Sequence, residues 1–308
     1  MLQRATELDF RPEHRAPVET PLPRSRSSWS RGKRFDSAGA QIFYTDEGIG
    51  PPLVLVHGFA VSADLNFRLP GIIRQLRKSY RVIAVDQRGH GQSDKPHQQD
   101  AYGVAMAHDL LRLLDHLGLA RAHVFGYSLG GFVTLKLACL AQERLISLGV
   151  LGAGFESEES GGASFLEAIP KLADALEAGR GVEPLSGHLG ASRARPSLGH
   201  RAWVRLVTRF LNDQRALIGV IRGAPALAVT AAELALLRIP ICSIVGELDP
   251  LARGAHALAE AVPSCSVTVI PGADHVQAPM RAEFRDALLE FLGESRPGAP
   301  LPGSATTC

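Results

Sequence analysis

Residues 123–131, His-Val-Phe-Gly-Tyr-Ser-Leu-Gly-Gly, contain the strongest local signal in the chain. The apolar run His123–Phe125 predicts a short strand that enters this segment, and Leu129–Gln142 predicts a helix that leaves it. A serine at such a junction lies on a sharp turn, where glycines two positions before and after it relieve the crowding. The hydroxyl of Ser128 would then face a helix N-terminus, whose free N–H groups favour negative charge. The alternative is a glycine- and serine-rich turn with a purely structural role.

Strand and helix signals alternate along most of the chain. Short β-rich runs predict strands at Gln41–Tyr44, Leu53–Val56, Tyr80–Asp86, His123–Phe125, Leu145–Leu151, Pro240–Val245 and Ser266–Ile270. Helical stretches lie near Leu69–Lys78, Val104–Leu117, Leu129–Gln142, Ala255–Ala261 and Arg281–Leu292. Repeated β-then-α units with short connections predict an α/β fold, with a mainly parallel sheet and helices on both faces.

This alternation stops after Gly152. The next 80 or so residues contain helical stretches but no clear strand signal, for example at Phe165–Leu176, Ala202–Leu211 and Gln214–Ile221. We therefore expect a helical cap inserted between two parts of one sheet. The predicted divisions are a flexible basic arm (1–34), the first part of the core (35–154), the cap (155–237), the second part of the core (238–293) and a flexible tail (294–308).

The composition of the chain limits the class of protein it can be and the kinds of partner it can bind. The chain has 308 residues, 45% of them apolar and 21% charged, which is typical of a globular protein. A formal net charge of only +2 argues against nucleic-acid binding. The absence of a long apolar run argues against a membrane span. Residues 1–34 are rich in basic side chains, and the alternative to a flexible arm is contact with a partner subunit or an anionic surface. Oligomeric state is left open.

Two features of the sequence bear on location and on metals. The first ten residues have no apolar segment before their charges, which argues against a secretory signal. The four cysteines have no metal-ligand spacing, so we expect no metal site, and a reducing compartment fits best. The predicted location is cytoplasmic.

A serine hydroxyl is a poor nucleophile until a base removes its proton. The best candidate base is His275, just after the last predicted strand, and the acid that would orient it is Asp249, just after the preceding strand. The chain order serine, acid, histidine is the order stated for a fold with such a turn. Asp274 and Glu247 are the alternative acids.

A tetrahedral intermediate also needs hydrogen-bond donors for its oxyanion. We expect these to be the backbone N–H groups of Leu129 and Phe59, the latter in the loop after the Leu53–Val56 strand. His57 precedes that loop, and its expected role is to shape the loop by hydrogen bonding. A second motif, Asp86-Gln87-Arg88-Gly89-His90-Gly91-Gln92-Ser93-Asp94, predicts a tight loop, with a metal or phosphate site as the alternative.

Together these motifs resemble the α/β-hydrolase superfamily, in its cap-bearing branch of serine esterases, lactonases and haloperoxidase-like hydrolases. The resemblance extends over roughly residues 40–293. It implies an eight-stranded, mostly parallel sheet, a catalytic triad of Ser128, Asp249 and His275, and oxyanion N–H groups at Phe59 and Leu129. Epoxide hydrolases and haloalkane dehalogenases of this fold have aspartate at the sharp turn, so Ser128 argues against both.

The expected activity is hydrolysis of carboxylic esters of small to medium apolar molecules through an acyl-enzyme, with no cofactor. The expected pocket residues are Tyr127, Phe165, Trp203 and Phe210, although the cap residues among them have spacings that also suit plain helix packing. The same triad could serve lactone opening, carbon–carbon bond hydrolysis, perhydrolysis or acyl transfer. A protein on this scaffold that binds a ligand without catalysis is the alternative from another class.

Overall fold

The computed structural model describes residues 31–155, 165–182, 184–185 and 210–294. Within these residues, eight strands form one sheet in the order β1-β2-β4-β3-β5-β6-β7-β8. Only β2 runs antiparallel to its neighbours, which confirms the predicted mostly parallel sheet. The strands are β1 (Lys33–Ser37), β2 (Ala40–Glu47), β3 (Pro52–Val56), β4 (Arg81–Val85), β5 (Ala122–Tyr127), β6 (Leu145–Leu151), β7 (Ile241–Gly246) and β8 (Cys265–Ile270).

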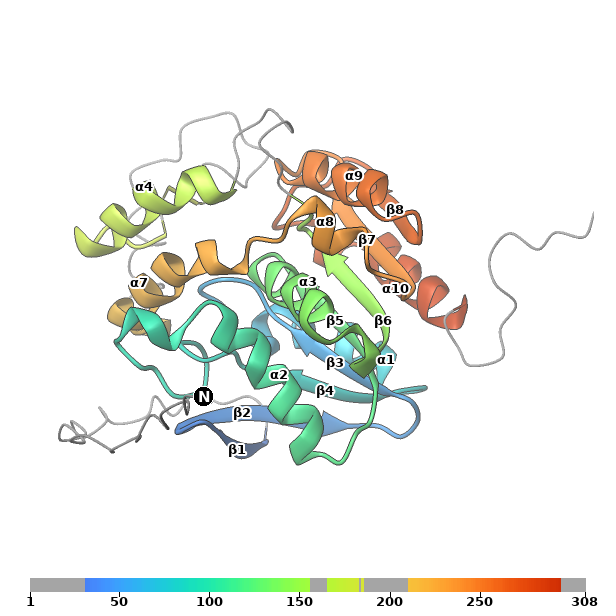
Figure 1. Cartoon of the computed structure of the whole chain (residues 1–308), viewed down its shortest axis with the longest axis horizontal. Coiled ribbons are helices and arrows are strands. Elements are labelled where there is room, and N and C mark those ends of the chain that lie inside the picture. The colour runs from blue at the N-terminus through green and yellow to red at the C-terminus, as the bar shows by residue number, and fades with distance from the viewer. Residues whose placement is uncertain (1–30, 156–164, 183, 186–209, 295–308) are drawn as a thin grey trace, which may run out of the picture.

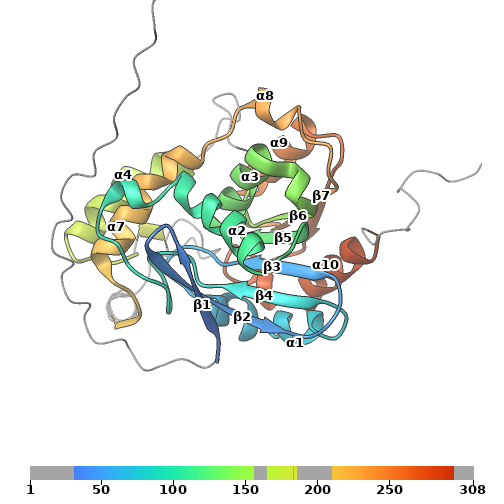
Figure 2. The same cartoon turned by 60° about the horizontal axis from the view of Figure 1, so that its bottom comes forward.

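Helices cover both faces of the sheet, because its central strands are apolar on both faces. Along β3, Val54 and Val56 belong to one apolar cluster, whereas Leu53 and Leu55 belong to the other. The first cluster includes residues of α2 (Val104–His116), α3 (Leu129–Ala141) and α9 (Ala252–Ala261). The second includes residues of α1 (Ile72–Leu76) and α10 (Ala282–Glu294). Figure 2 shows α2 and α3 on one side of the sheet and α1 and α10 on the other.

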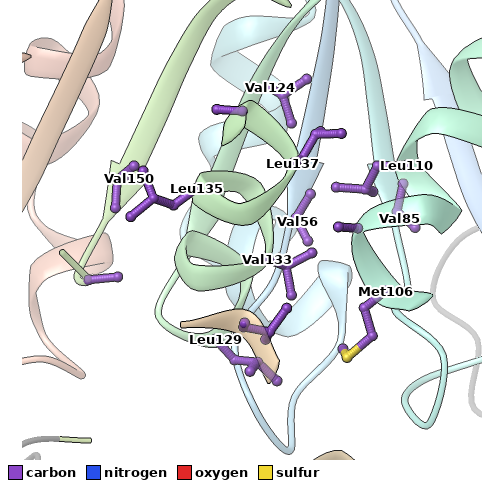
Figure 3. Close-up of a cluster of buried hydrophobic side chains, with 14 of the residues drawn as sticks. Val56, Val85, Met106, Leu110, Val124, Leu129, Val133, Leu135, Leu137 and Val150 are labelled. Atoms are coloured by element: carbon purple, nitrogen blue, oxygen red, sulfur yellow. The ribbon is translucent and has the colours of Figure 1, made fainter. Parts of the chain in front are cut away.

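Helix α3 lies at the centre of the first cluster. Its Val133 and Leu137 lie near Val56 of β3, and its Leu135 lies near Val150 of β6 (Figure 3). Nine of its 13 residues are buried, and full burial of a large apolar side chain contributes about 1.5–3 kcal/mol. The packing therefore holds α3, and the turn that precedes it, firmly against the sheet.

Two elements at the start of the core differ from the prediction. Strand β1 begins at Lys33, so Lys33 and Arg34 belong to the sheet and not to the arm. Only Phe35 and Ser37 of this strand are buried, and such a short alternation is a weak sequence signal. The helix expected near Leu69–Lys78 is shorter, because Pro70 and Gly71, which has φ 80°, precede α1.

Between β6 and β7 the described residues form helices and turns and contain no strand. These helices are α4 (Phe165–Glu177), α7 (Gln214–Gly223) and α8 (Ala231–Leu234), and α4 packs against α7 (Figure 1). A Cβ atom on Gly219 of α7 would lie 2.6 Å from the Tyr102 ring, and one on Gly223 would lie 2.8 Å from the Tyr102 Cβ, which shows how tightly α7 packs on the core. None of the helices in the described ranges is long and apolar enough to cross a membrane.

Candidate active site

The candidate site lies where the sheet changes its direction of winding. From β3 the chain moves to β4 on one side, whereas from β5 it moves to β6 on the other. The loops after two such adjacent strands diverge and leave a crevice at the carboxyl edge of the sheet, where ligands of α/β proteins bind. The register pairs Val56 with Gly126, so the loop of residues 57–60 faces Ser128. A Cβ atom on Gly58 would lie 3.2 Å from the Ser128 Cβ.

Ser128 lies on a strained turn between β5 and α3. Its φ of 54° and ψ of −119° are rare for a residue with a side chain, and such a conformation costs on the order of 1–3 kcal/mol. The flanking glycines are required by close contacts: a Cβ on Gly126 would lie 2.0 Å from the Gly130 oxygen, and one on Gly130 would lie 2.1 Å from the Val56 oxygen. The turn thus places the Ser128 side chain at the carboxyl edge of β5.

Three side chains from distant parts of the chain meet at this edge. Nε2 of His275 lies 3.0 Å from Oγ of Ser128, and Nδ1 of His275 lies 2.7 Å from Oδ2 of Asp249. The other oxygen of Asp249 accepts the N–H of Leu251 at 2.9 Å. Because an ionised carboxylate only accepts hydrogen bonds, the imidazole proton lies on Nδ1, and Nε2 is free to accept the hydroxyl proton.

The two alternative acids have other partners. Glu247 is exposed, and its carboxylate accepts the N–H of Gly272 at 2.7 Å. The carboxylate of Asp274 accepts the N–H groups of Val276 and Gln277, which closes the turn that follows His275. The carboxylate hydrogen-bonded to the imidazole is that of Asp249.

Tyr127, one of the predicted pocket residues, lies in the core next to the His275 ring. Only 4% of its surface is exposed, and its ring packs against Phe284 in the second apolar cluster. Its hydroxyl donates a hydrogen bond to the backbone oxygen of His275, and burial raises the pKa of this hydroxyl well above its usual value. Tyr127 therefore supports His275 from inside the core. Sequence alone gave no signal for this contact, since the two residues are 148 positions apart.

The other predicted pocket residues belong to the predicted cap, in the sequence between β6 and β7. Phe210 is 74% exposed. Trp203 and the side chain of Phe165 lie outside the described residues. The composition of the pocket stays a prediction.

The predicted oxyanion donors belong to the residue that follows Ser128 and to the loop of residues 57–60 that faces it. Leu129 begins α3, so its N–H has no acceptor within the helix, and Phe59 follows the Gly58 that contacts Ser128. Across the described ranges, neither of these N–H groups donates to a protein acceptor. Two free donors near a serine hydroxyl suit a developing oxyanion.

Hydrogen bonds hold the two peptide groups on either side of the Gly58 Cα, the second of which contains the Phe59 N–H. Nδ1 of His57 lies 2.7 Å from the Gly58 oxygen, and the Gly58 N–H donates to Oδ1 of Asn66 at 2.8 Å. In a trans peptide the N–H and the C=O point in opposite directions. Because the Gly58 C=O points towards His57, the Phe59 N–H of the same peptide group points away from His57. The sequence did not reveal Asn66, which lies in a short π-helical turn, η1 (Asp64–Arg68), outside any motif.

The second histidine at this edge is neutral and structural. Nε2 of His57 accepts the N–H of Gln87 at 3.0 Å, so its proton lies on Nδ1. Complete burial lowers the pKa of His57, and the nearby Asp86 charge opposes this effect. These bonds agree with the predicted loop-shaping role.

The motif of residues 86–94 also forms a structural loop. The Asp86 carboxylate accepts the N–H groups of Ala63 at 2.9 Å and Gln92 at 2.8 Å, while Arg88 forms a buried ion pair with Asp109. No group of three or more potential metal ligands occurs in the part of the chain that the structure describes.

Comparison with known proteins gives the same fold. The sequence profile of the alpha/beta hydrolase fold family matches residues 51–181. Over 256 residues the chain is 32% identical to the dihydrolipoyllysine-residue acetyltransferase component of the acetoin cleaving system of Pseudomonas putida. That match covers 79% of this chain and 64% of the relative, so the chain spans less than two thirds of that protein's length.

Solved structures are similar over most of the chain. An esterase from Thermogutta terrifontis has a TM-score of 0.70 and 25% identity, with 87% of this chain and all of that chain covered. A meta-cleavage product hydrolase from Pseudomonas fluorescens has a TM-score of 0.65 and 26% identity, covering 86% of this chain and 98% of that one. The protein belongs to the α/β-hydrolase superfamily.

Proposed function

We propose that this protein is a serine hydrolase that cleaves carboxylic ester bonds through an acyl-enzyme. The observation that carries the proposal is the continuous hydrogen-bond chain from Asp249 through His275 to Ser128. Such a chain lets a buried imidazole remove a proton from an alcohol that is otherwise unreactive at neutral pH.

In the proposed reaction, Ser128 Oγ attacks the ester carbonyl while Nε2 of His275 takes its proton. Asp249 holds the imidazole in place and stabilises its charged form. The N–H groups of Phe59 and Leu129 stabilise the oxyanion, and one such donor typically contributes about 2.7–4 kcal/mol. His275 then gives the proton to the leaving alcohol, and a water activated by the same imidazole releases the acid.

The residue at the sharp turn supports ester cleavage over two other reactions of the superfamily. Ser128 stands where epoxide hydrolases and haloalkane dehalogenases have aspartate. A serine hydroxyl attacks a carbonyl carbon and forms an acyl-enzyme. In epoxide hydrolases and haloalkane dehalogenases, the aspartate carboxylate is the nucleophile that attacks a carbon of the substrate. The esterase similarity supports the same choice. We take the substrate to be a small molecule bound between the sheet edge and the cap.

Carbon–carbon bond hydrolysis is the second candidate, favoured by the similarity to a meta-cleavage product hydrolase. The same three side chains would serve it, with a carbanion as the leaving group in place of an alkoxide. Acyl transfer remains an alternative as well, since the P. putida relative is described as an acetyltransferase component. A cytoplasmic location stays a prediction, and Cys139, Cys242 and Cys265 are free thiols, as a reducing compartment favours.

A substrate panel tests the proposal. Purified protein is assayed with p-nitrophenyl esters of increasing acyl length, with lactones and with vinylogous 1,5-diketones, each against the Ser128→Ala variant. We expect Ser128-dependent hydrolysis of the p-nitrophenyl esters at the highest kcat/KM. Higher kcat/KM on the diketones would favour carbon–carbon hydrolysis, and no Ser128-dependent turnover of any member would contradict the proposal.

A further inference from the structure

The cap contacts the loop that contains a proposed oxyanion donor. Asn212 lies just before α7, and its side-chain Nδ2 donates a hydrogen bond to the backbone oxygen of Ala60 at 3.1 Å. Ala60 is the residue after Phe59. This bond joins two residues that are 152 positions apart in the sequence. Asn212 belongs to the cap, and Ala60 lies at the carboxyl edge of the sheet.

Ala60 adopts a conformation that needs such support. Its φ is 58°, in the left-handed region that residues with a Cβ atom seldom adopt and that costs roughly 1 kcal/mol or more. Among the described residues, only Ala38 and Ser128 share this feature without being glycine. Strained residues persist when their surroundings fix them, and the Asn212 amide is a hydrogen-bond partner of the Ala60 carbonyl.

The neighbouring residue makes a second contact between cap and core, which provides a natural comparison. Oδ2 of Asp213 lies 3.0 Å from Nε2 of His97, and its Oδ1 accepts the Ala216 N–H at the start of α7. This pair also holds α7 on the core, but it contacts residue 97 and not the 57–60 loop.

We propose that Asn212 is a positioning residue that couples the docked cap to the geometry of the Phe59 N–H. The Asn212 amide holds the Ala60 carbonyl, the loop keeps its left-handed turn, and the Phe59 donor stays aimed at the oxyanion position. The inference rests on the proposed serine hydrolase function. According to this inference, the start of α7 affects the rate of the chemical step in addition to covering the site.

Steady-state kinetics of two matched variants test this role. Asn212→Ala removes the bond to the 57–60 loop, whereas His97→Ala removes the neighbouring contact between cap and core. We expect Asn212→Ala to lower kcat for the best ester about 10-fold with KM changed less than about threefold, because a misdirected oxyanion donor weakens transition-state binding. We expect His97→Ala to keep kcat within about twofold. Equal losses in kcat, or none in Asn212→Ala, would overturn the proposal.

The Ala60→Gly substitution tests the part played by backbone strain. Glycine adopts a positive φ without the Cβ penalty, so Ala60→Gly in the Asn212→Ala background should restore kcat about threefold. The absence of any recovery would overturn the role given to the Ala60 conformation.

Hydrogen–deuterium exchange separates this inference from the proposed function. We expect Asn212→Ala to speed exchange in the peptide that contains residues 57–62, and His97→Ala to leave that peptide unchanged. This readout holds even if the wild-type protein hydrolyses no ester. Unchanged exchange in Asn212→Ala would refute the coupling, whereas loss of Ser128-dependent hydrolysis in the wild type would refute only the proposed function.

Discussion

Two loops at the carboxyl edge of the sheet each present a buried histidine, yet the two histidines have different partners. His275, after β8, contacts a carboxylate on one side and a serine hydroxyl on the other. The imidazole of His57, after β3, forms its hydrogen bonds with backbone groups, those of Gly58 and Gln87. An imidazole between an acid and an alcohol can transfer a proton, whereas one between two peptide groups can only fix their orientation. The role of each histidine therefore follows from its hydrogen-bond partners, and not from its burial or its position at the edge of the sheet.

The largest expected effect separates these two histidines. His275→Ala should lower kcat by about 10⁴-fold or more, because it removes the only proposed proton acceptor for Ser128. His57→Asn keeps a donor near the Gly58 oxygen and should cost about 10-fold, since it disturbs a supporting bond only. Both are measured by steady-state ester hydrolysis, with circular dichroism to check folding. A His57→Asn loss as large as that of His275→Ala would erase the distinction.

The next effect concerns the acid. Asp249→Asn should lower kcat by about 10³–10⁴-fold, because the amide cannot stabilise a charged imidazole. The matched control is Glu247→Gln, a nearby acid whose partner is a surface N–H, and its kcat should stay within about twofold. If Glu247→Gln were the inactive variant and Asp249→Asn active, the acid would be assigned wrongly.

A smaller effect tests the support beneath His275. Tyr127→Phe removes the bond to the His275 oxygen and should reduce kcat about three- to tenfold. Tyr80→Phe is the control, because its hydroxyl also donates to a buried backbone oxygen, that of Leu292. Tyr80 immediately precedes β4, at the edge of the sheet opposite to the site. Each variant should lose about 1 kcal/mol of stability, measured by urea unfolding. Equal kcat values for the two would show that Tyr127 has no bearing on the imidazole.

The smallest effect concerns pH and a histidine with no role at the edge. Burial, together with the Arg121 charge, lowers the pKa of His123 to about 4. As pH falls, His123 therefore binds a proton in the unfolded chain at a higher pH than in the folded protein. The free energy of unfolding consequently decreases between about pH 6.5 and pH 4. His123→Val, a residue suited to a strand, should flatten the slope of unfolding free energy against pH by up to about 1.4 kcal/mol per unit.

Urea unfolding at pH 7, 6 and 5 measures this slope. The slope is informative even if His123→Val is less stable at every pH, because the variant leaves Ser147 without its partner. His57 and His90 are also buried with lowered pKa values, and their contribution is common to both proteins. Identical slopes would contradict the assignment to His123.

The sequence predicted the features that depend on local pattern. Continuous apolar runs such as Leu53–Val56 and Leu145–Leu151 predicted buried strands, and the glycines around Ser128 predicted the sharp turn. What it missed depends on contacts between distant residues. Strand β1 has only two inward-facing residues, so its period is too short to recognise. The partners of Tyr127, Asn66 and Asn212 follow from how loops and cap pack, which no spacing along the chain records.

The most direct test of the central claim is mass spectrometry after treatment with a fluorophosphonate probe. The probe reacts with a serine only when a base activates its hydroxyl and donors stabilise the oxyanion. We predict one stoichiometric adduct on the peptide that contains Ser128, lost in Ser128→Ala and slowed by at least 10³-fold in His275→Ala. A folded wild-type protein that forms no adduct at Ser128, or forms it equally fast without His275, would contradict the account.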